Sequence, residues 1–406
     1  MEQRVVIVGG GPAGMAAALA AAEAGADVTL LERRSKPGKK LLATGNGRCN
    51  LAHTGAPVYF GDAAFAGKVF GVLPPDAVTR QLEAWGLPLY TDAEGRVYPA
   101  TQQASSVLST LTTRMRERGV RLVTGADVVS AAREAGQYIA VTADGQAFRG
   151  SRLVLATGGL AGGNLGNRRE DYGLAEAFEH TVTPLFAGLA PLECELGRLK
   201  RLSGLRVPAR VSFCTGGAVR AATAGEVLFT DYGLSGICVM QLAREAHGLL
   251  TAGRQPELRI DFSPVFFPGG RAYGRLDTPV PDAKQKTLAL LRERERLYGP
   301  DGMLVGLLPD PLIGCCPKGS AERLAGFLTA LSLRVTGVRP FQQAQVTCGG
   351  VDTAEVDPMT LESRLSPGLY PVGELLNADG DCGGYNLQFA FATGLIAGRS
   401  AARGHK

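Results

Sequence analysis

The sequence predicts an α/β fold in which a parallel sheet begins at the N-terminus, is interrupted by a long insertion and is completed near the C-terminus. A β-branched run, Arg4 to Val8, leads through a glycine turn into an alanine-rich helix that ends at Gly25. A second strand covers 27–31, and a last central strand covers 369–372. Between these strands, the pattern over 186–339 changes to short strands with Gly and Pro turns and then to helical periodicity, which predicts a separate unit.

The glycine turn after the first strand has the spacing of a phosphate cradle. We expect Gly9 to make the tight turn, Gly11 to let the backbone approach a pyrophosphate, and Gly14 to let the helix pack closely on the strand. Pro12 and Ala13 open the helix, whose free N–H groups complete the anion site.

The second strand supports the same interpretation because it ends in an acid. Glu32 follows Gly14 by eighteen positions, which is where a dinucleotide-binding unit places a carboxylate for the ribose hydroxyls. A GxGxxG turn alone is a weak signal. Together with its flanking strand, its helix and this acid, it predicts a Rossmann site rather than a chance turn.

Length and composition describe an ordinary globular protein. The 406 residues are enough for two or three domains, and 45% hydrophobic with 20% charged residues argues against a disordered chain. The formal net charge of +5 is expected to be spread along the chain, so a nucleic-acid partner gains little support. The charge-free stretch 5–22 contains glycines and switches from strand to helix, which indicates a buried unit of a cytoplasmic protein and no membrane partner.

The cysteines and histidines point to no metal site. Eight cysteines include the adjacent pair Cys315-Cys316 and no CxxC, so both the dithiol redox motif and the usual zinc spacings are missing. The four histidines, at positions 53, 180, 247 and 405, form no triad or ligand set. For His53, packing is favoured over proton donation.

A long polar loop after Glu32 and two later segments are more specific. The loop reads GKKLLATGNGRCN over 38–50, and the later segments read VTCGGV over 346–351 and GDCGGYNLQFAFATG over 380–394. Together they are similar to a bacterial family of FAD-binding oxidoreductases called the aminoacetone-oxidase family, which also contains the flavoprotein that reduces 3-dehydro bile acids. The resemblance covers nearly the whole chain.

The resemblance implies bound FAD. It places Val128 at the adenine and Glu374 at a ribitol hydroxyl. Besides these residues and the first turn, the predicted cofactor contacts are Arg33, Lys40, Leu41, Gly45, Asn46, Gly47, Arg48, Cys49, Asn50, Ala156, Thr157, Gly158, Gly373, Asp381, Gly384, Tyr385, Asn386 and Leu387.

The resemblance also implies a glutathione-reductase-like FAD-binding Rossmann domain. Its helices are expected at 76–85 and 103–118, followed by a β meander and a strand over 152–155. The predicted domain covers 1–185 and 340–406, and the inserted unit covers 186–339, β-rich and barrel-like over 186–275 and helical over 276–339, with helices at 282–298 and 320–335. Relatives usually carry a GSTGDG-like sequence where this chain has Asn167 to Asp171, so no contact is carried over to that loop.

The two ends of the flavin are expected to meet different chemistry. A helix starting near Asn386 would direct free N–H groups at the pyrimidine edge and stabilise the reduced, anionic ring. Arg48 and Asn50, with Asn46, are candidates for polarising a substrate carbonyl, or else they tie the loop to the insertion. Tyr385 either donates a proton or packs, and Cys49 is expected to be a packed thiol.

The predicted function is an FAD-dependent oxidoreductase that transfers hydride between flavin N5 and a small organic substrate. The resemblance supports both enone or alkene reduction and amine oxidation. No second GxGxxG occurs in a βαβ context, so NAD(P)H is expected to visit the substrate cleft as a transient electron donor. The alternatives are an FAD-dependent tRNA-modifying flavoprotein and a flavin-holding protein without turnover.

Overall fold

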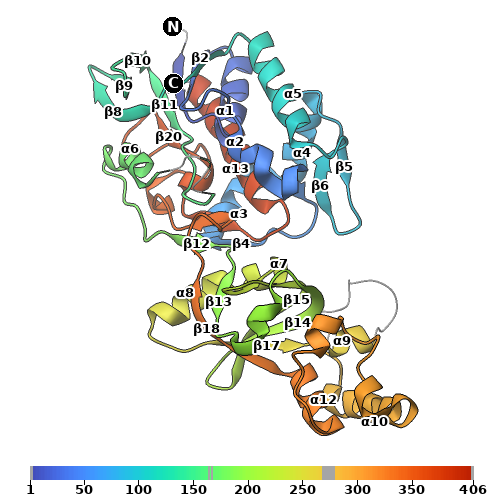
Figure 1. Cartoon of the computed structure of the whole chain (residues 1–406). Coiled ribbons are helices and arrows are strands. Elements are labelled where there is room, and N and C mark those ends of the chain that lie inside the picture. The colour runs from blue at the N-terminus through green and yellow to red at the C-terminus, as the bar shows by residue number, and fades with distance from the viewer. Residues whose placement is uncertain (1–2, 163–164, 166–167, 268–278, 404–406) are drawn as a thin grey trace. The chain divides into compact units, whose positions relative to one another are not determined.

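The computed structural model describes residues 3–162, 165, 168–267 and 279–403. The chain divides into two compact units, Met1–Phe186 with Val346–Lys406, and Ala187–Gln345 (Figure 1). The predicted junction at 275/276, Asn167 and His405 lie outside the described residues. In the described part of the chain, no helix combines the length and apolar character needed to cross a membrane.

A five-stranded parallel sheet forms the centre of the first unit. Its order is β20-β11-β1-β2-β7, with β1 in the middle. The strands are β1 (Arg4–Val8), β2 (Asp27–Glu32), β7 (Arg121–Thr124), β11 (Arg152–Leu155) and β20 (Leu369–Pro371). Because the strands are parallel, the loops that follow them meet at one edge of the sheet, where ligands bind in open α/β folds.

Two helices rich in small residues pack against each other beside this sheet. They are α1 (Pro12–Glu23) and α13 (Tyr385–Arg403), which lie side by side in Figure 1. A Cβ at Gly394 would overlap the carbonyl oxygen of Ala13, and one at Gly398 would overlap that of Ala17. These glycines therefore allow the two helix backbones to approach closely.

Smaller elements complete the first unit. An antiparallel meander contains β8 (Val128–Glu134), β9 (Gln137–Thr142) and β10 (Ala147–Gly150). Two further small sheets pair β3 (Ala52–His53), β6 (Arg96–Pro99) and β5 (Leu89–Thr91), and β21 (Ala378–Gly380) with β4 (Tyr59–Gly61). The main helices are α3 (Ala63–Val72), α4 (Pro75–Ala84) and α5 (Ala104–Glu117).

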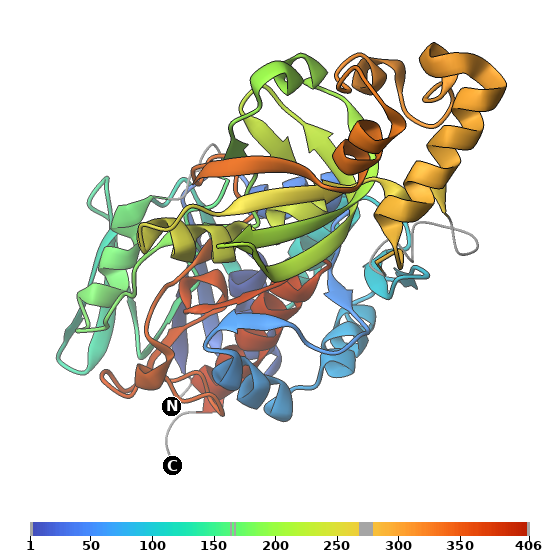
Figure 2. The same cartoon turned by 90° about the horizontal axis from the view of Figure 1, so that it is seen from below.

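The second unit is built on a closed six-stranded barrel in the order β13-β16-β15-β14-β17-β18 (Figure 2). The strands are β13 (Leu192–Cys194), β14 (Arg206–Thr215), β15 (Ala218–Phe229), β16 (Gly233–Ser235), β17 (Glu257–Asp261) and β18 (Leu331–Val338). Its helices include α7 (Ile237–Met240), α8 (Ala243–Thr251), α10 (Ala283–Gly302) and α12 (Ala321–Thr329).

The predicted helix over 320–335 is wrong in its second half. Helix α12 ends at Thr329, and the chain continues as β18, the strand that closes the barrel. Residues 331–336 alternate strictly between buried and exposed, with Leu331, Leu333 and Val335 facing inward. This period of two is typical of a strand, so the end of the segment predicted as helical belongs to the barrel.

Candidate active site

The turn after β1 requires two of its glycines for its own shape. Gly9 has a φ of +108°, and a Cβ there would overlap the carbonyl oxygen of Ala156. A Cβ at Gly14 would overlap the carbonyl oxygen of Gly9, so this glycine lets α1 pack on the turn. Gly11 differs, because its φ is −77° and a Cβ there would meet no atom within 4 Å. The protein thus leaves space at Gly11, where the predicted pyrophosphate would approach.

Glu32 ends β2 with its carboxylate held against this turn. Its Oε2 accepts a hydrogen bond from the N–H of Gly10 at 2.9 Å, and its Oε1 accepts one from the N–H of Arg34 at 2.7 Å. A carboxylate accepts about four hydrogen bonds, so these donors orient Glu32 and leave capacity for ribose hydroxyls. The N–H of Ala126 donates to the Glu32 carbonyl at 2.9 Å, which places the start of β8 and the buried Val128 nearby.

A second glycine turn leads into α13. Gly383 and Gly384 have φ values of +128° and +107°, which favour glycine. A Cβ at Gly384 would lie 2.5 Å from Oδ1 of Asn50, so this turn packs directly on the loop of the first motif. The first turn of α13 has N–H groups without intrahelical acceptors and a partial positive charge, and it provides a second site for an electron-rich group.

The side chain of Asn386 braces the second turn from within. Its Oδ1 accepts from the N–H of Gly380 at 2.8 Å, and its Nδ2 donates to the carbonyls of Gly380 at 2.7 Å and Asp381 at 3.3 Å. The helix begins one residue earlier, at Tyr385. Because the Asn386 amide is committed to the turn, the cofactor contact predicted here is left to backbone N–H groups.

The N-termini of α1 and α13 point in the same direction but are offset along it. Gly394 packs at the level of Ala13, and Gly398 at the level of Ala17, so the two helices run parallel. Helix α13 begins at Tyr385, nine residues before Gly394, whereas α1 begins at Pro12, one residue before Ala13, so α13 extends about 12 Å further. A dinucleotide has groups far enough apart to reach both N-termini, whereas a single phosphate does not.

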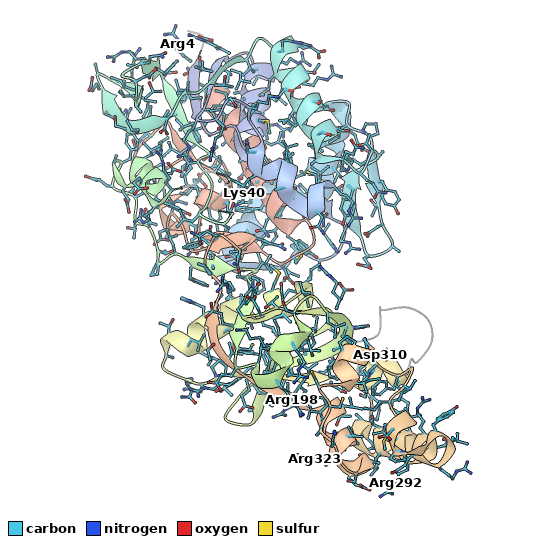
Figure 3. The ribbon with its side chains drawn as sticks, viewed as in Figure 1. Arg4, Lys40, Arg198, Arg292, Asp310 and Arg323 are labelled. Atoms are coloured by element: carbon cyan, nitrogen blue, oxygen red, sulfur yellow. The ribbon has the colours of Figure 1, made fainter. Side chains whose placement is uncertain are left out.

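Glu374 connects two of the three sequence motifs, 38–50 and 346–351. Its Oε2 accepts a hydrogen bond from Nζ of Lys40 at 2.5 Å, and its Oε1 accepts one from the N–H of Thr347 at 2.9 Å (Lys40 is labelled in Figure 3). A Cβ at Gly159, just beyond β11, would lie 2.9 Å from the same Oε1. The predicted ribitol-binding acid therefore lies where segments from four parts of the chain meet.

The loop over 38–50 contains two non-glycine residues with a left-handed backbone conformation. Asn46 and Cys49 have φ values of +55° and +62°. This left-handed conformation costs a non-glycine residue roughly 1–3 kcal/mol and is common at functional sites. Cys49 is fully buried, and burial raises the pKa of its thiol to about 12 despite a hydrogen bond with Thr44. Cys49 is therefore a packed thiol.

Tyr385 lies in a cluster of aromatic rings at the second turn. The His53 ring stacks on it with centroids 4.8 Å apart and an interplanar angle of 22°, and Tyr59 meets it edge-on at 6.0 Å. Burial raises the pKa of the Tyr385 phenol, and the charge of Asp381 raises it further. Tyr385 therefore keeps its proton at neutral pH, as a proton donor must before the reaction.

The His53 ring packs against Tyr385, next to the second glycine turn. Its Nδ1 accepts a hydrogen bond from the N–H of Gly55 at 2.8 Å, so the proton of the neutral imidazole lies on Nε2. Asn50, against Gly384, completes the group around Tyr385. Of the three predicted catalytic residues, Asn50 and Tyr385 are thus brought together.

Arg48 lies elsewhere on the loop. Its guanidinium carbon is 5.0 Å from the centroid of the Tyr98 ring, and both Arg48 and Asn46 are exposed. The structure does not bring these two side chains into the Tyr385 cluster. Their role at a substrate carbonyl stays a prediction.

Five buried polar atoms of this unit have no hydrogen-bond partner within the described ranges, and three of them lie close to the candidate cofactor site: Oδ1 of Asn50, Oγ1 of Thr157 and the hydroxyl of Tyr172. Burial raises the pKa of Tyr172, and the charge of Glu374 adds to the rise, which places this hydroxyl within the field of that carboxylate. A buried polar atom without a partner costs about 1–3 kcal/mol. The hydroxyl, phosphate and amide groups of FAD would supply partners, so the residues present fit this cofactor. The sequence gives no indication of this role for Tyr172, because buried tyrosines are common in protein cores.

The remaining predicted contacts lie on the same turns. Leu41 is buried in α2 (Lys39–Ala43), Gly45 and Gly47 belong to the short helix η1 (Thr44–Gly47), and Leu387 is in the first turn of α13. Ala156, Thr157 and Gly158 follow β11, and Gly373 precedes Glu374. Over the residues that the structure describes, no group of three or more His, Cys, Asp or Glu is placed to hold a metal ion.

The fold and the two helix N-termini define a dinucleotide-binding Rossmann protein. The family described as "HI0933-like protein Rossmann domain" matches residues 3–400, and the chain belongs to this family of FAD-dependent oxidoreductases. The chain is 36% identical to the 3-dehydro-bile acid delta(4,6)-reductase of Clostridium scindens, over 98% of this chain and 99% of that protein. It is 28% identical to the ribosomal RNA dihydrouridine synthase of Escherichia coli, over 98% of each chain.

Solved structures include similar chains. The 3-ketosteroid delta1-dehydrogenase of Sterolibacterium denitrificans has a TM-score of 0.49 and 13% identity, over 98% of this chain and 99% of that one. The 3-ketosteroid-delta4-(5alpha)-dehydrogenase of Rhodococcus jostii has a TM-score of 0.45 and 16% identity, over 99% and 97%.

Proposed function

We propose that this FAD-dependent oxidoreductase reduces an activated carbon–carbon double bond of a small organic substrate, with NAD(P)H as the electron donor. The observation that carries the proposal is the position of the Tyr385 phenol, which stacks on His53 at the N-terminus of α13 and adjoins the contact between Gly384 and Asn50. The name of the Clostridium scindens relative describes this chemistry for that protein.

The reaction needs two electrons, one hydride and one proton. FAD, when bound, supplies the two-electron carrier. A hydride adds to the β-carbon of an enone, the π electrons move toward the carbonyl oxygen, and the hydroxyl of Tyr385 gives its proton to the α-carbon. Solvent then reprotonates Tyr385, so that NAD(P)H, one proton and the alkene give NAD(P)⁺ and the saturated product.

Asn50 and the second turn prepare this step. The amide of Asn50 lies against Gly384, and its nitrogen is a suitable donor to a substrate carbonyl or to the cofactor. The α13 N-terminus favours negative charge nearby. Amine oxidation has no comparable need for a group that retains its proton, which is why we favour alkene reduction.

Anaerobic absorbance spectroscopy tests this proposal. NADH or NADPH should bleach the bound flavin, and a 3-keto steroid enone should restore its colour. Bleaching by a primary amine, with no recovery on adding an enone, would contradict alkene reduction and favour amine oxidation. No bleaching by either nicotinamide would contradict the proposed donor.

A Tyr385→Phe variant tests whether Tyr385 is the proton donor. The ring remains, so the His53 stack and flavin binding should persist, and bleaching by NAD(P)H should be unchanged. Recovery of colour with the enone should slow by about 100-fold or more. A wild-type recovery rate in this variant would show that Tyr385 only packs.

The uneven charge of the two units favours a second candidate function. The expectation that charge is spread along the chain is wrong: the unit Ala187–Gln345 has 20 Lys and Arg against 14 Asp and Glu, a formal charge of +6, whereas the rest of the chain has a charge of −1. Arg198, Arg292 and Arg323 of this unit are labelled in Figure 3. A basic unit is typical of proteins that bind nucleic acid.

We therefore propose reduction of uridine in RNA as the alternative. The C5–C6 double bond of uracil is conjugated to a carbonyl, so the same hydride and proton transfers would reduce it. The name of the Escherichia coli relative describes this outcome for ribosomal RNA in that protein. Mass spectrometry of ribosomal RNA and tRNA incubated with the enzyme and NADPH tests it. A gain of two hydrogens at uridine would support it, and unchanged RNA with active enone reduction would reject it.

A further inference from the structure

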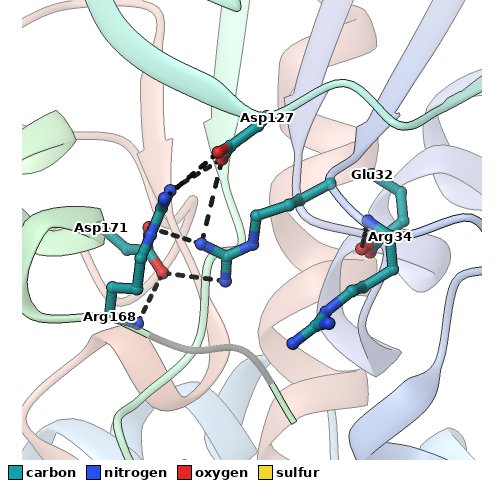
Figure 4. A network of polar contacts seen from close by, with 6 residues as sticks. Glu32, Arg34, Asp127, Arg168 and Asp171 are labelled. Atoms are coloured by element: carbon teal, nitrogen blue, oxygen red, sulfur yellow. Dashed lines mark hydrogen bonds and ion pairs between the residues drawn. The ribbon is translucent and has the colours of Figure 1, made fainter. Parts of the chain in front are cut away.

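Four charged side chains near the end of β2 form a closed network, here called the four-residue clasp: Arg33, Asp127, Arg168 and Asp171. Figure 4 shows this network, with the last three of these residues labelled. Asp171 accepts two hydrogen bonds from the Arg33 guanidinium, both at 3.3 Å. Asp127 accepts two from the Arg168 guanidinium, at 2.7 and 3.2 Å. Cross contacts join the pairs, with Arg168 Nη2 at 3.3 Å from Asp171 and Arg33 Nη1 at 3.9 Å from Asp127.

The clasp connects three segments that are distant in sequence. Arg33 directly follows Glu32, and Asp127 directly precedes Val128, so both positions adjoin the residues predicted to meet the adenosine half of FAD. Asp171 belongs to the short helix η3 (Arg169–Tyr172), and Arg168 is the residue directly before that helix. The clasp therefore fixes η3 against the end of β2 and the start of β8.

Burial and geometry distinguish the clasp from ordinary surface ion pairs. The Asp171 side chain is 10% exposed and also accepts from the backbone N–H of Arg168 at 3.0 Å. The hydrogen bond to Asp127 raises the pKa of Arg168 despite the opposing effect of burial. Two bidentate pairs that share partners hold their side chains more firmly than an isolated exposed pair does.

We infer that the four-residue clasp holds η3 in place over the adenosine half of FAD. The clasp then strengthens FAD binding, and bound FAD stabilises the clasp. This inference rests on the proposed ribose position at Glu32. Asp171 and Arg168 are positioning residues, because they act through Arg33 and the backbone of η3.

The test compares FAD affinity and thermal stability in three full-length variants. Asp171→Asn keeps the side-chain shape and removes the charge shared by both arginines. Arg168→Gln removes a guanidinium whose side chain is 41% exposed. This variant is expected to fold even if Asp171→Asn does not. Glu170→Gln is the matched control, because Glu170 lies on the same η3, is exposed, and loses one carboxylate charge as Asp171→Asn does.

The clasp variants should bind FAD about 10- to 100-fold more weakly than wild type, and the control should be unchanged. FAD should also raise their melting temperature less than it raises that of wild type, because a ligand stabilises in proportion to its affinity. Equal melting-temperature losses with and without FAD, at unchanged affinity, would overturn the inference and leave the clasp as a structural brace. Wild-type protein that binds no FAD would instead contradict the proposed function.

Discussion

At the scale of single residues, the glycines of the first turn have two different roles. Two of them allow the protein backbone to pack closely, and one leaves space for a ligand. Gly9 and Gly14 are required by neighbouring backbone, whereas a Cβ at Gly11 would project into space free of protein atoms. The carboxylate of Glu32 is likewise oriented by two backbone N–H groups before any ribose arrives. The turn is thus preorganised for the cofactor.

A Gly11→Ala variant should fold normally and bind FAD poorly. Its φ of −77° suits alanine, so its melting temperature without FAD should stay close to that of wild type. The added methyl group would occupy the predicted pyrophosphate position, and FAD affinity, measured by fluorescence quenching, should fall by about 10-fold or more.

Gly14→Ala is the matched comparison. Its Cβ would overlap the carbonyl oxygen of Gly9, so this variant should lose about 1–3 kcal/mol of unfolding free energy even without FAD. Unaltered FAD affinity in Gly11→Ala would show that the pyrophosphate does not lie at this turn.

Thiol chemistry gives a pH-dependent prediction at Cys382 in the second turn. Burial raises the pKa of this thiol to about 11, and the charge of Asp381 contributes to the rise. The reactive thiolate is then a minor form at pH 8 and increases about tenfold per pH unit up to pH 11. Alkylation by iodoacetamide, followed by peptide mass spectrometry, should be about 100-fold slower at Cys382 in native than in unfolded protein. Equal rates at pH 8 would contradict this environment.

Residue roles could be predicted from the sequence where a local rule applies. The glycines of the first turn, Glu32 and Glu374 follow from spacing or from resemblance. Tyr172 and Asp171 could not be predicted, because their roles depend on partners far away in the chain. The resemblance assigns Asn386 to the cofactor, but its side chain holds the turn, a distinction that only the hydrogen bonds reveal.

At the scale of elements, the site depends on how α13 packs along α1. The two helices bring both N-termini to one side of the sheet with an offset of about 12 Å. Strand and helix order in the first unit could be predicted because periodicity and glycine turns are strong there. The prediction for the end of the insertion is wrong because it extends the helical pattern of 320–329 over residues 331–336, whose alternating apolar and polar residues form β18.

A Gly394→Ala variant should separate the two helices. The new Cβ would overlap the carbonyl oxygen of Ala13, so the unfolding free energy should fall by about 1–3 kcal/mol and FAD affinity should fall with it. Gly67→Ala in α3 is the control, because its Cβ meets no atom within 4 Å. That change should be neutral or stabilise by up to about 1 kcal/mol in urea unfolding. Equal stability of the two variants would contradict the close helix packing.

At the scale of the whole molecule, chemistry and charge lie in different units. The first unit holds the candidate cofactor site and has a formal charge of −1, whereas the inserted unit has a charge of +6. The sum of +5 conceals this division, which is why composition alone argued against nucleic acid. Within the inserted unit, Arg206 is paired with Glu226 at 2.6 Å, while Lys200 and Arg201 are exposed on η4 (Gly197–Leu202).

If RNA is the substrate, a Lys200→Glu/Arg201→Glu double variant should bind ribosomal RNA fragments about 10-fold more weakly in a shift assay. The salt dependence of binding should also become shallower, by about one unit for each phosphate that the protein no longer neutralises. The matched control is Arg116→Glu, an exposed position on α5 of the first unit, which should leave RNA binding unchanged. Enone reduction should be unaffected in both variants. Equal RNA affinity in all three proteins would remove this surface from the RNA hypothesis.

The central claim is that two glycine turns, one near each end of the chain, hold a single FAD. The most direct measurement is the amount and identity of flavin released when purified, never-unfolded protein is denatured. We predict one FAD per chain, retained by wild type and lost on dialysis of Gly11→Ala. A colourless protein that also fails to bind added FAD, or one that releases only FMN, would contradict the account.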